Sequence, residues 1–161
     1  MRGLSFITGG ELYAVDVTLV QKVARRLSVT PVPSAPPEIL GIANLKGRVI
    51  TVLSLNKLLG LDESNESEYG INTIVFKSGG ATEDQMGLAI EKPGNLIDLS
   101  DDSIKSPHLS NEYEEGFCIS GIAEADNEFY RVINIDAIMQ RYMTGTEAIT
   151  TNATFGGDDN E

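Results

Sequence analysis

The chain has 161 residues, of which 41% are hydrophobic, and a formal net charge of −12. This content is enough for one domain with a packed core, and the negative charge argues against a nucleic-acid-binding protein, which needs basic surface to displace counterions. No apolar run approaches the roughly 20 residues of a membrane-spanning helix. Cys118 is the only cysteine, so an internal disulfide is excluded and a reducing, cytoplasmic location is expected.

Charge is unevenly distributed along the chain. Residues 1–60 carry seven Lys or Arg and three Asp or Glu, a balance of +4, whereas residues 61–161 carry five and twenty-one, a balance of −16. A solvated acidic surface with an acidic tail is the usual explanation of this pattern. An adaptor whose two ends attract different partners is a more specific alternative, and composition leaves both interpretations open.

The first residues predict a β-hairpin followed by a helix. Residues 3–15 are apolar on both sides of Gly9-Gly10, which predicts two strands and a glycine turn. A short helix capped by Asp16 is predicted next, because apolar residues then recur at helical spacing. These residues are Val20, Val23, Ala24 and Leu27.

The stretch from residue 30 to residue 61 is the most informative. Its prolines, between Pro31 and Pro37, fix the backbone and remove donors, so the segment should be extended and outside any sheet. A tight turn follows at Asn44–Gly47, whose glycine can take a positive φ. The turn leads into an apolar strand, residues 48–53, expected to be covered on both faces. Ser54 is predicted to cap a short helix.

The second half predicts further short strands. Their expected ranges are 71–77, 86–91, 95–99, 117–123 and 129–135. Pro93-Gly94 is expected to interrupt the second and third of them. A polar linker is expected at 62–70 and an irregular segment at 101–115. Asn134 or Asp136 is predicted to cap a final helix.

The two halves share an order of elements. Gly41-Ile42-Ala43, four residues, Arg48-Val49-Ile50 and a short helix recur as Gly121-Ile122-Ala123, seven residues, Arg131-Val132-Ile133 and a short helix. Each copy follows a strand pair with a Gly-Gly connection. A fixed order of this kind predicts two similar β units in tandem.

We therefore predict one domain, residues 1–143, followed by an acidic disordered tail, residues 144–161. Within the domain, the units are placed at about 1–61 and 71–143, and an exchange of strands between them is left open. Short strands at close spacing favour small barrels over a parallel α/β sheet. The fold class is accordingly mainly β.

No group of residues predicts catalysis or metal binding. His108 is the only histidine and has no partner at ligand spacing. Cys118 has no second cysteine and no basic neighbour, so it is expected to be a small buried hydrophobe. Gly41–Gly47 lacks the residue order of a phosphate loop. We predict a protein that is not an enzyme and that needs no metal and no cofactor.

Several motifs point to one family. They are Tyr13-Ala14-Val15-Asp16, Val20-Gln21-Lys22-Val23, Thr30-Pro31-Val32-Pro33-Ser34-Ala35-Pro36, Gly41-Ile42-Ala43-Asn44-Leu45-Lys46-Gly47, Gly87-Leu88-Ala89-Ile90 and Val132-Ile133-Asn134-Ile135. Together they resemble the CheW-like family, the coupling proteins of bacterial chemotaxis, over about residues 4–143.

The resemblance implies two intertwined SH3-like five-stranded β-barrels with short helices. It implies a non-catalytic adaptor that binds the cytoplasmic tip of a methyl-accepting chemoreceptor in a groove between subdomains. It also implies binding to the regulatory domain of a CheA-type histidine kinase through the subdomain ends. Nucleic acid and direct membrane insertion are not expected. The residues implied in partner binding are Lys22, Val23, Asn44, Leu45, Lys46, Gly47 and Arg48.

The chain also departs from the family pattern. Lys22 replaces an acidic residue and Lys46 replaces an arginine, so a pair of opposite charges becomes two positive ones, and Asn56 stands where the family usually has arginine. An array for twitching motility is therefore an alternative to chemotaxis. Three further alternatives stay open. Asn44–Gly47 can be turn geometry without a partner, and both lysines can be ordinary surface charges. The whole domain can also be a peptide- or small-ligand-binding barrel. The nearby apolar residues Val20, Val23, Ile42 and Val49 are expected to be mainly core.

Overall fold

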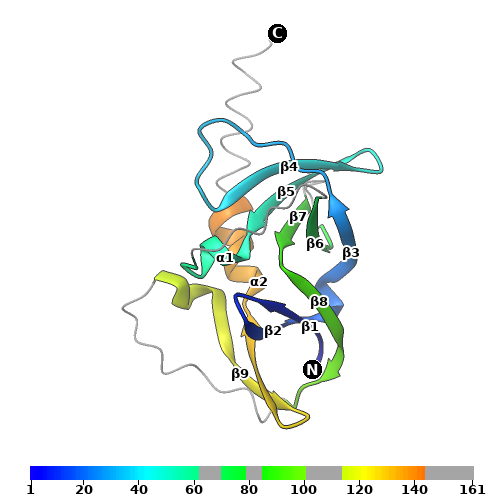
Figure 1. The fold of residues 1–161 in the computed structure, drawn as a ribbon, viewed down its shortest axis with the longest axis vertical. Helices are drawn as coiled ribbons and strands as arrows, with labels where there is room; N and C mark the ends of the chain where they lie inside the picture. The colour runs from blue at the N-terminus through cyan, green and yellow to red at the C-terminus, as the bar shows by residue number, and fades with distance from the viewer. Residues whose placement is uncertain (62–69, 79–84, 101–113, 144–161) are drawn as a thin grey trace.

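The computed structural model describes residues 1–61, 70–78, 85–100 and 114–143, and these residues form a mainly β protein (Figure 1). Their strands form two five-stranded sheets, so the predicted fold class is confirmed. The whole predicted tail, and most of the predicted linker and of the irregular segment, lie outside the described residues.

The first sheet, which we call barrel A, has the strand order β8-β1-β2-β10-β9. Its strands are β1 (Arg2–Thr8), β2 (Glu11–Asp16), β8 (Lys92–Asp98), β9 (Ile119–Ala125) and β10 (Glu128–Ile133). The predicted first hairpin is confirmed, because Gly9 and Gly10 join β1 to β2 with φ values of 58° and 77°. The β2 and β10 strands pair in parallel, and the other neighbours are antiparallel.

The second sheet, barrel B, has the strand order β3-β6-β7-β5-β4. Its strands are β3 (Val20–Leu27), β4 (Ile39–Leu45), β5 (Arg48–Ser54), β6 (Ile71–Phe76) and β7 (Gln85–Ala89). Here β5 and β7 are the parallel pair. Thr30 bridges Ile42 of β4 through two backbone hydrogen bonds of 2.8 Å, so the chain that follows β3 returns to the opposite edge of the sheet.

Short helical turns connect the strands. They are η1 (Val17–Leu19), α1 (Leu55–Leu58), η3 (Glu114–Cys118), α2 (Ile135–Ile138) and the π-turn η4 (Met139–Met143). Ser54 Oγ accepts a hydrogen bond from Lys57 N at 3.2 Å, and Asn134 Oδ1 accepts one from Ala137 N at 3.0 Å. Both side chains satisfy donors at a helix start, so the two predicted caps are confirmed.

The two halves of the chain are related by symmetry. If β1 to β5 are matched one by one with β6 to β10, the strand order of one sheet becomes the strand order of the other. A hairpin (β1–β2 or β6–β7) lies in one barrel, and the next three strands lie in the other. Residues 1–61 and 71–143 therefore both contribute strands to both barrels. Gly41 pairs with Val52, and Gly121 pairs with Val132.

This pairing corrects one part of the predicted repeat. The two glycine motifs are equivalent, but Arg48-Val49-Ile50 and Arg131-Val132-Ile133 are not, because Val132 is equivalent to Val52. Both hairpins close with two-residue turns at positive φ, Lys46-Gly47 and Asp126-Asn127. The two hairpins therefore have the same length. The predicted repeat had spaced its two motifs by four residues in one copy and by seven in the other, which equal hairpins do not allow.

The predicted helix over Val20–Leu27 is wrong, because these residues form β3. The pairing of β3 with β6 shifts register between Val20 and Lys22 and again between Ala24 and Leu27. Bulges of this kind break the alternation of a strand, so the inward residues fall at a spacing that imitates a helix. Asp16 is still a cap, but of the 3-10 turn η1, where its side chain accepts from Thr18 N.

Two other predictions need correction. Pro93-Gly94 does not interrupt the sheet: both residues belong to β8, and the pairing with β1 shifts register beside them. The strand is at the edge of barrel A, where a proline leaves no ladder donor missing. Phe117 and Cys118 belong to η3, so the strand predicted over 117–123 starts at Ile119.

The proline segment lies outside the named strands, as predicted, but it is not extended. Ala35 N donates to Val32 O at 3.3 Å and Ile39 N donates to Pro36 O at 2.9 Å, so the segment contains two turns. Ser34 takes a φ of 66° in the first of them. Proline is common in such turns because its fixed φ suits one of their positions.

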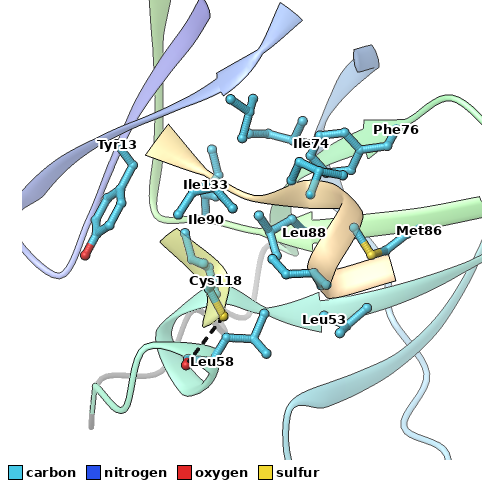
Figure 2. Packing of buried hydrophobic residues seen from close by; sticks show 14 of the residues in the cluster. Tyr13, Leu53, Leu58, Ile74, Phe76, Met86, Leu88, Ile90, Cys118 and Ile133 are labelled. Atoms are coloured by element: carbon cyan, nitrogen blue, oxygen red, sulfur yellow. Dashed lines mark hydrogen bonds between the residues drawn. The ribbon is translucent and has the colours of Figure 1, made fainter. Parts of the chain in front are cut away.

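Three apolar clusters fill the described part of the molecule. One lies within barrel A (Ala14, Leu99, Ala123, Ala125, Tyr130 and Val132) and one within barrel B (Ala24, Leu27, Ala43, Ile50, Val52, Ile71, Val75 and Ala89). The largest draws on both barrels and on α1 and α2, and Figure 2 shows Tyr13, Leu53, Ile74, Leu88 and Ile133 converging on it. Because α2 packs in this shared cluster, it contributes to the contact between the two barrels (Figure 1).

Candidate partner-binding site

The turn between β4 and β5 brings five of the predicted site residues together. Lys46 and Gly47 have φ values of 53° and 83°, the pattern of a two-residue hairpin turn with both central residues left-handed. Asn44 Oδ1 accepts a hydrogen bond from Gly47 N at 3.0 Å. The predicted turn and its glycine are thus confirmed. The side chain of Asn44 is already used to hold the turn, while Lys46 and Arg48 are exposed.

Apolar side chains next to this turn face outward. Asn44 pairs with Val49 and Ile42 pairs with Thr51, which places Ile42, Asn44 and Val49 on one face of the hairpin. Ile42 is 38% exposed and Val49 is 52% exposed. Both were expected to be mainly core, and β5 is covered on both faces only from Ile50 onward. Arg48 and Val49 are both exposed and Ile50 and Thr51 are both buried, so strict alternation along β5 does not predict the exposure of Val49.

The proline segment also carries an exposed apolar side chain. Val32 is 39% exposed and lies two residues after Thr30, which pairs with Ile42. Of the six large hydrophobic side chains exposed in the described ranges, three therefore belong to β4, to β5 or to the segment that Thr30 joins to β4. Exposed apolar side chains that gather in this way indicate an interaction surface more strongly than scattered ones.

The remaining two predicted site residues lie on another strand. Lys22 and Val23 are in β3, at the opposite end of the strand order from β4, and both are half-buried. Val23 packs against the cluster shared by the barrels. The structure thus brings together residues 44–48. Of the other two, Val23 faces the cluster shared by the barrels, whereas Lys22 pairs with Val75 on the other face of β3.

Sequence reasoning did not single out Arg25 and Arg26. Both are exposed at the bulge near the end of β3, where Arg26 has a φ of 57°. Figure 1 shows this end of β3 beside the β4–β5 hairpin, and the bridge of Thr30 to Ile42 joins the two segments. With Lys46 and Arg48, they make this side of barrel B basic, in agreement with the positive balance of residues 1–60.

The described residues hold no cluster of three or more His, Cys, Asp or Glu side chains that could hold a metal. Cys118 is fully buried, with its Sγ 4.0 Å from Leu58 O (Figure 2). Burial raises the pKa of the Tyr13 and Tyr142 phenols above 10.0, so both stay neutral at physiological pH.

His108 lies outside the described residues. No helix in the described part of the chain is long and apolar enough to span a membrane.

Comparison with known proteins agrees with this fold. The scaffolding protein TtCheW of Thermoanaerobacter tengcongensis has a similar structure, with a TM-score of 0.72 and 27% identity, covering 83% of this chain and 88% of that one. Chemotaxis protein CheW of Bacillus subtilis (strain 168) is 26% identical over 137 residues, 84% of this chain and 85% of that protein. Chemotaxis protein CheW of Thermotoga maritima is 25% identical over 137 residues, 85% and 86% of the two chains. The model of the CheW-like domain matches residues 2–143.

The chain belongs to the CheW-like domain family. It is accordingly a chemotaxis coupling adaptor, and nothing in the comparisons supports the alternative of a ligand-binding barrel outside chemoreceptor arrays. In this CheW-like domain the hairpin tip combines apolar and cationic side chains on a firmly paired sheet. Such a surface can bind a protein with complementary apolar and acidic groups.

Proposed function

We propose that this CheW-like domain couples the cytoplasmic tip of a methyl-accepting chemoreceptor to the regulatory domain of a CheA-type histidine kinase. The observation that carries the proposal is the exposed tip of the β4–β5 hairpin, where Ile42 and Val49 lie beside Lys46 and Arg48. Protein interfaces combine apolar contact in the centre with charged groups at the rim. The tip offers both in one place, and in cells we place the protein in the cytoplasm, where these partner regions are exposed.

The proposed contacts divide between two surfaces. Residues 44–48, extended by Ile42 and Val49, are assigned to the end of barrel B and to the kinase. Lys22 and Val23 are assigned to the receptor tip, since Val23 packs against the cluster shared by the barrels and both side chains are only half-buried. Adaptor function needs both surfaces to be available at once, and separate positions on β3 and on the hairpin meet that requirement.

The charges at the hairpin predict the character of the partner. Lys46 and Arg48 form none of the ion pairs that the described residues contain. Exposed cations of this kind attract an acidic partner surface and raise the rate of association more than the final affinity. Asp or Glu side chains are therefore expected on the part of the kinase domain that meets this tip.

Titration calorimetry with each isolated partner tests the proposal. The chain is expected to bind the kinase regulatory domain and the receptor tip with dissociation constants between submicromolar and tens of micromolar, about −9 to −6 kcal/mol. The double variant K46E/R48E should weaken kinase binding at least about tenfold, because it places carboxylates against an acidic surface. The matched control is K77E/K92E, which reverses two exposed lysines elsewhere in the fold.

The outcomes separate the parts of the proposal. Absence of binding to both partners would contradict adaptor function in this form. Equal weakening by K46E/R48E and by K77E/K92E would mean that net charge, and not the hairpin tip, controls association. Loss of receptor binding with intact kinase binding in K46E/R48E would reverse the assignment of the two surfaces.

A further inference from the structure

A group of buried polar side chains lies between the two barrels. Thr8, at the end of β1 in barrel A, and Asn56, in α1 beside barrel B, are both 0% exposed. Thr8 Oγ1 donates a hydrogen bond to Asn56 Oδ1. Because a buried polar atom without a partner costs about 1–3 kcal/mol, these two side chains are stable only while the two elements keep their relative position.

Glu91 also belongs to this group, and it lies where the chain passes from barrel B to barrel A. Only Ile90 and Glu91 separate β7 of barrel B from β8 of barrel A. Glu91 Oε2 accepts a hydrogen bond from Asn56 Nδ2 at 2.9 Å and another from Gly9 N at 3.1 Å. The main-chain carbonyl of Glu91 accepts from Asn72 Nδ2 at 3.1 Å. One carboxylate oxygen therefore holds the β1–β2 turn and α1 at the same time.

The β1–β2 turn also lies close to the segment that follows α1. Gly9 has a φ of 58°, and a Cβ at this position would lie 2.4 Å from Leu61 Cδ1. The amide of Leu61 in turn donates to Asn56 O at 2.7 Å. The turn that Glu91 holds therefore lies directly against Leu61, with no space for a side chain at Gly9 unless Leu61 shifts.

We propose that Thr8, Asn56 and Glu91 form a polar clamp that fixes the orientation of barrel A relative to barrel B. The shared apolar cluster supplies most of the contact between the barrels, but apolar attraction has no directional preference. Hydrogen bonds depend steeply on distance and angle, and a buried network that is fully paired specifies one arrangement. The clamp residues act as positioning residues, because they set the geometry without contacting a partner themselves.

The chemistry of Asn56 suits this role. Its amide accepts from Thr8 through Oδ1 and donates to Glu91 through Nδ2. An arginine, which the family resemblance leads one to expect here, has donors only, so a hydroxyl could not donate to it. The chain of hydrogen bonds from Thr8 to Glu91 therefore depends on an amide at position 56.

The clamp has a consequence for an adaptor, and this last step rests on the function proposed above. If one partner binds barrel B and the other binds between the barrels, the angle between the barrels determines where the second partner lies when the first is bound. A loose angle would leave each single affinity unchanged but would disorder the complex of all three proteins.

Residual dipolar couplings of the backbone amides, measured on the whole chain without any partner, test the clamp directly. The couplings of the two barrels are fitted to separate alignment tensors, which coincide when the barrels form one rigid body. Thr8→Val keeps the side-chain shape and removes the hydroxyl, and Glu91→Met removes the carboxylate at similar length. Thr8→Ser and Glu91→Gln keep hydrogen-bonding groups and serve as conservative variants. Thr73→Val is the matched control, because Thr73 is 0% exposed and donates to Ile71 O within barrel B.

The wild-type chain, both conservative variants and Thr73→Val are expected to give one common tensor. Thr8→Val and Glu91→Met are expected to give two tensors of different magnitude, with exchange of the Gly9 amide at least about tenfold faster in Glu91→Met. One common tensor in either removal variant that folds would overturn the inference. Two tensors in Thr73→Val would also overturn it, because any loss of a buried hydroxyl would then separate the barrels. No partner is present, so either result is independent of the adaptor proposal.

Discussion

Replacing Gly41 with alanine is expected to separate β4 from the segment after β3 that carries Thr30, and so to open barrel B. Gly41 has a φ of 152°, and a Cβ at this position would lie 2.1 Å from Thr30 O. That oxygen accepts a 2.8 Å hydrogen bond from Ile42 N, and Thr30 N donates a second one of 2.8 Å to Ile42 O. No Cβ atom tolerates a backbone oxygen at that distance, so the segment carrying Thr30 must move away and both bonds are lost.

The size of the effect follows from these contacts. Two backbone hydrogen bonds contribute about 1 kcal/mol each, and the strained backbone at Gly41 adds on the order of 1–3 kcal/mol for a residue with a side chain. The free energy of unfolding should therefore fall by about 3–5 kcal/mol, a large share of the roughly 5–15 kcal/mol of an ordinary domain. For a chain of this length, the melting temperature should fall by about 6–20 °C.

Urea denaturation followed by circular dichroism measures this loss, with Gly47→Ala as the matched control. Gly47 has a φ of 83°, but no atom lies within 4 Å of the position that an added methyl group would take. The same replacement there therefore costs only the conformational term of about 1–2 kcal/mol. Equal losses of stability in the two variants would refute the argument that close approach to Thr30 closes the barrel.

The remaining predictions concern stability and reactivity. Ser54→Ala and Asn134→Ala should each lower the free energy of unfolding by about 1 kcal/mol in urea, because each removes a helix cap. Phe76→Ala should lower it by about 3–5 kcal/mol, since Phe76 is 0% exposed in the shared cluster. Cys118 should react with a thiol reagent in urea but not in the native protein; fast native labelling would show that its cluster opens. Burial raises the pKa of Tyr13 above 10.0, so the unfolded chain loses this proton first and stability should fall as pH rises above that value. Denaturation at a series of pH values should show a smaller fall in Tyr13→Phe.

Turn chemistry made most of the fold predictable. Gly9-Gly10 and Gly47 identify turns at positive φ, and the repeated glycine motif at Gly41 and Gly121 identifies equivalent strands. The strand over Val20–Leu27 could not be predicted from spacing, because two bulges shift its inward residues. Bulges depend on the partner strand, which a local pattern does not contain.

The candidate site was predictable in part for a similar reason. The hairpin turn carries its own local signal, and residues 44–48 are adjacent in the chain. The exposure of Ile42 and Val49 depends on which face of the hairpin the rest of barrel B covers. The separation of Lys22 from Lys46 depends on strand order, which is a property of the whole sheet. Residue type alone determines neither the exposure of these apolar side chains nor the separation of the two lysines.

The division of the chain between the barrels has a consequence for its synthesis. Barrel B is built from one continuous segment, residues 20–89, whereas barrel A takes β1 and β2 from one end of the described chain and β8, β9 and β10 from the other. When the ribosome has synthesised the chain as far as β7, barrel B therefore has all its strands, while barrel A has only the β1–β2 hairpin with two unpaired edges. Chaperones that bind nascent chains are expected to bind this unpaired hairpin. In a circular permutant that begins at β8, all strands of barrel A would be synthesised in succession, so the hairpin would not stay unpaired during the synthesis of barrel B.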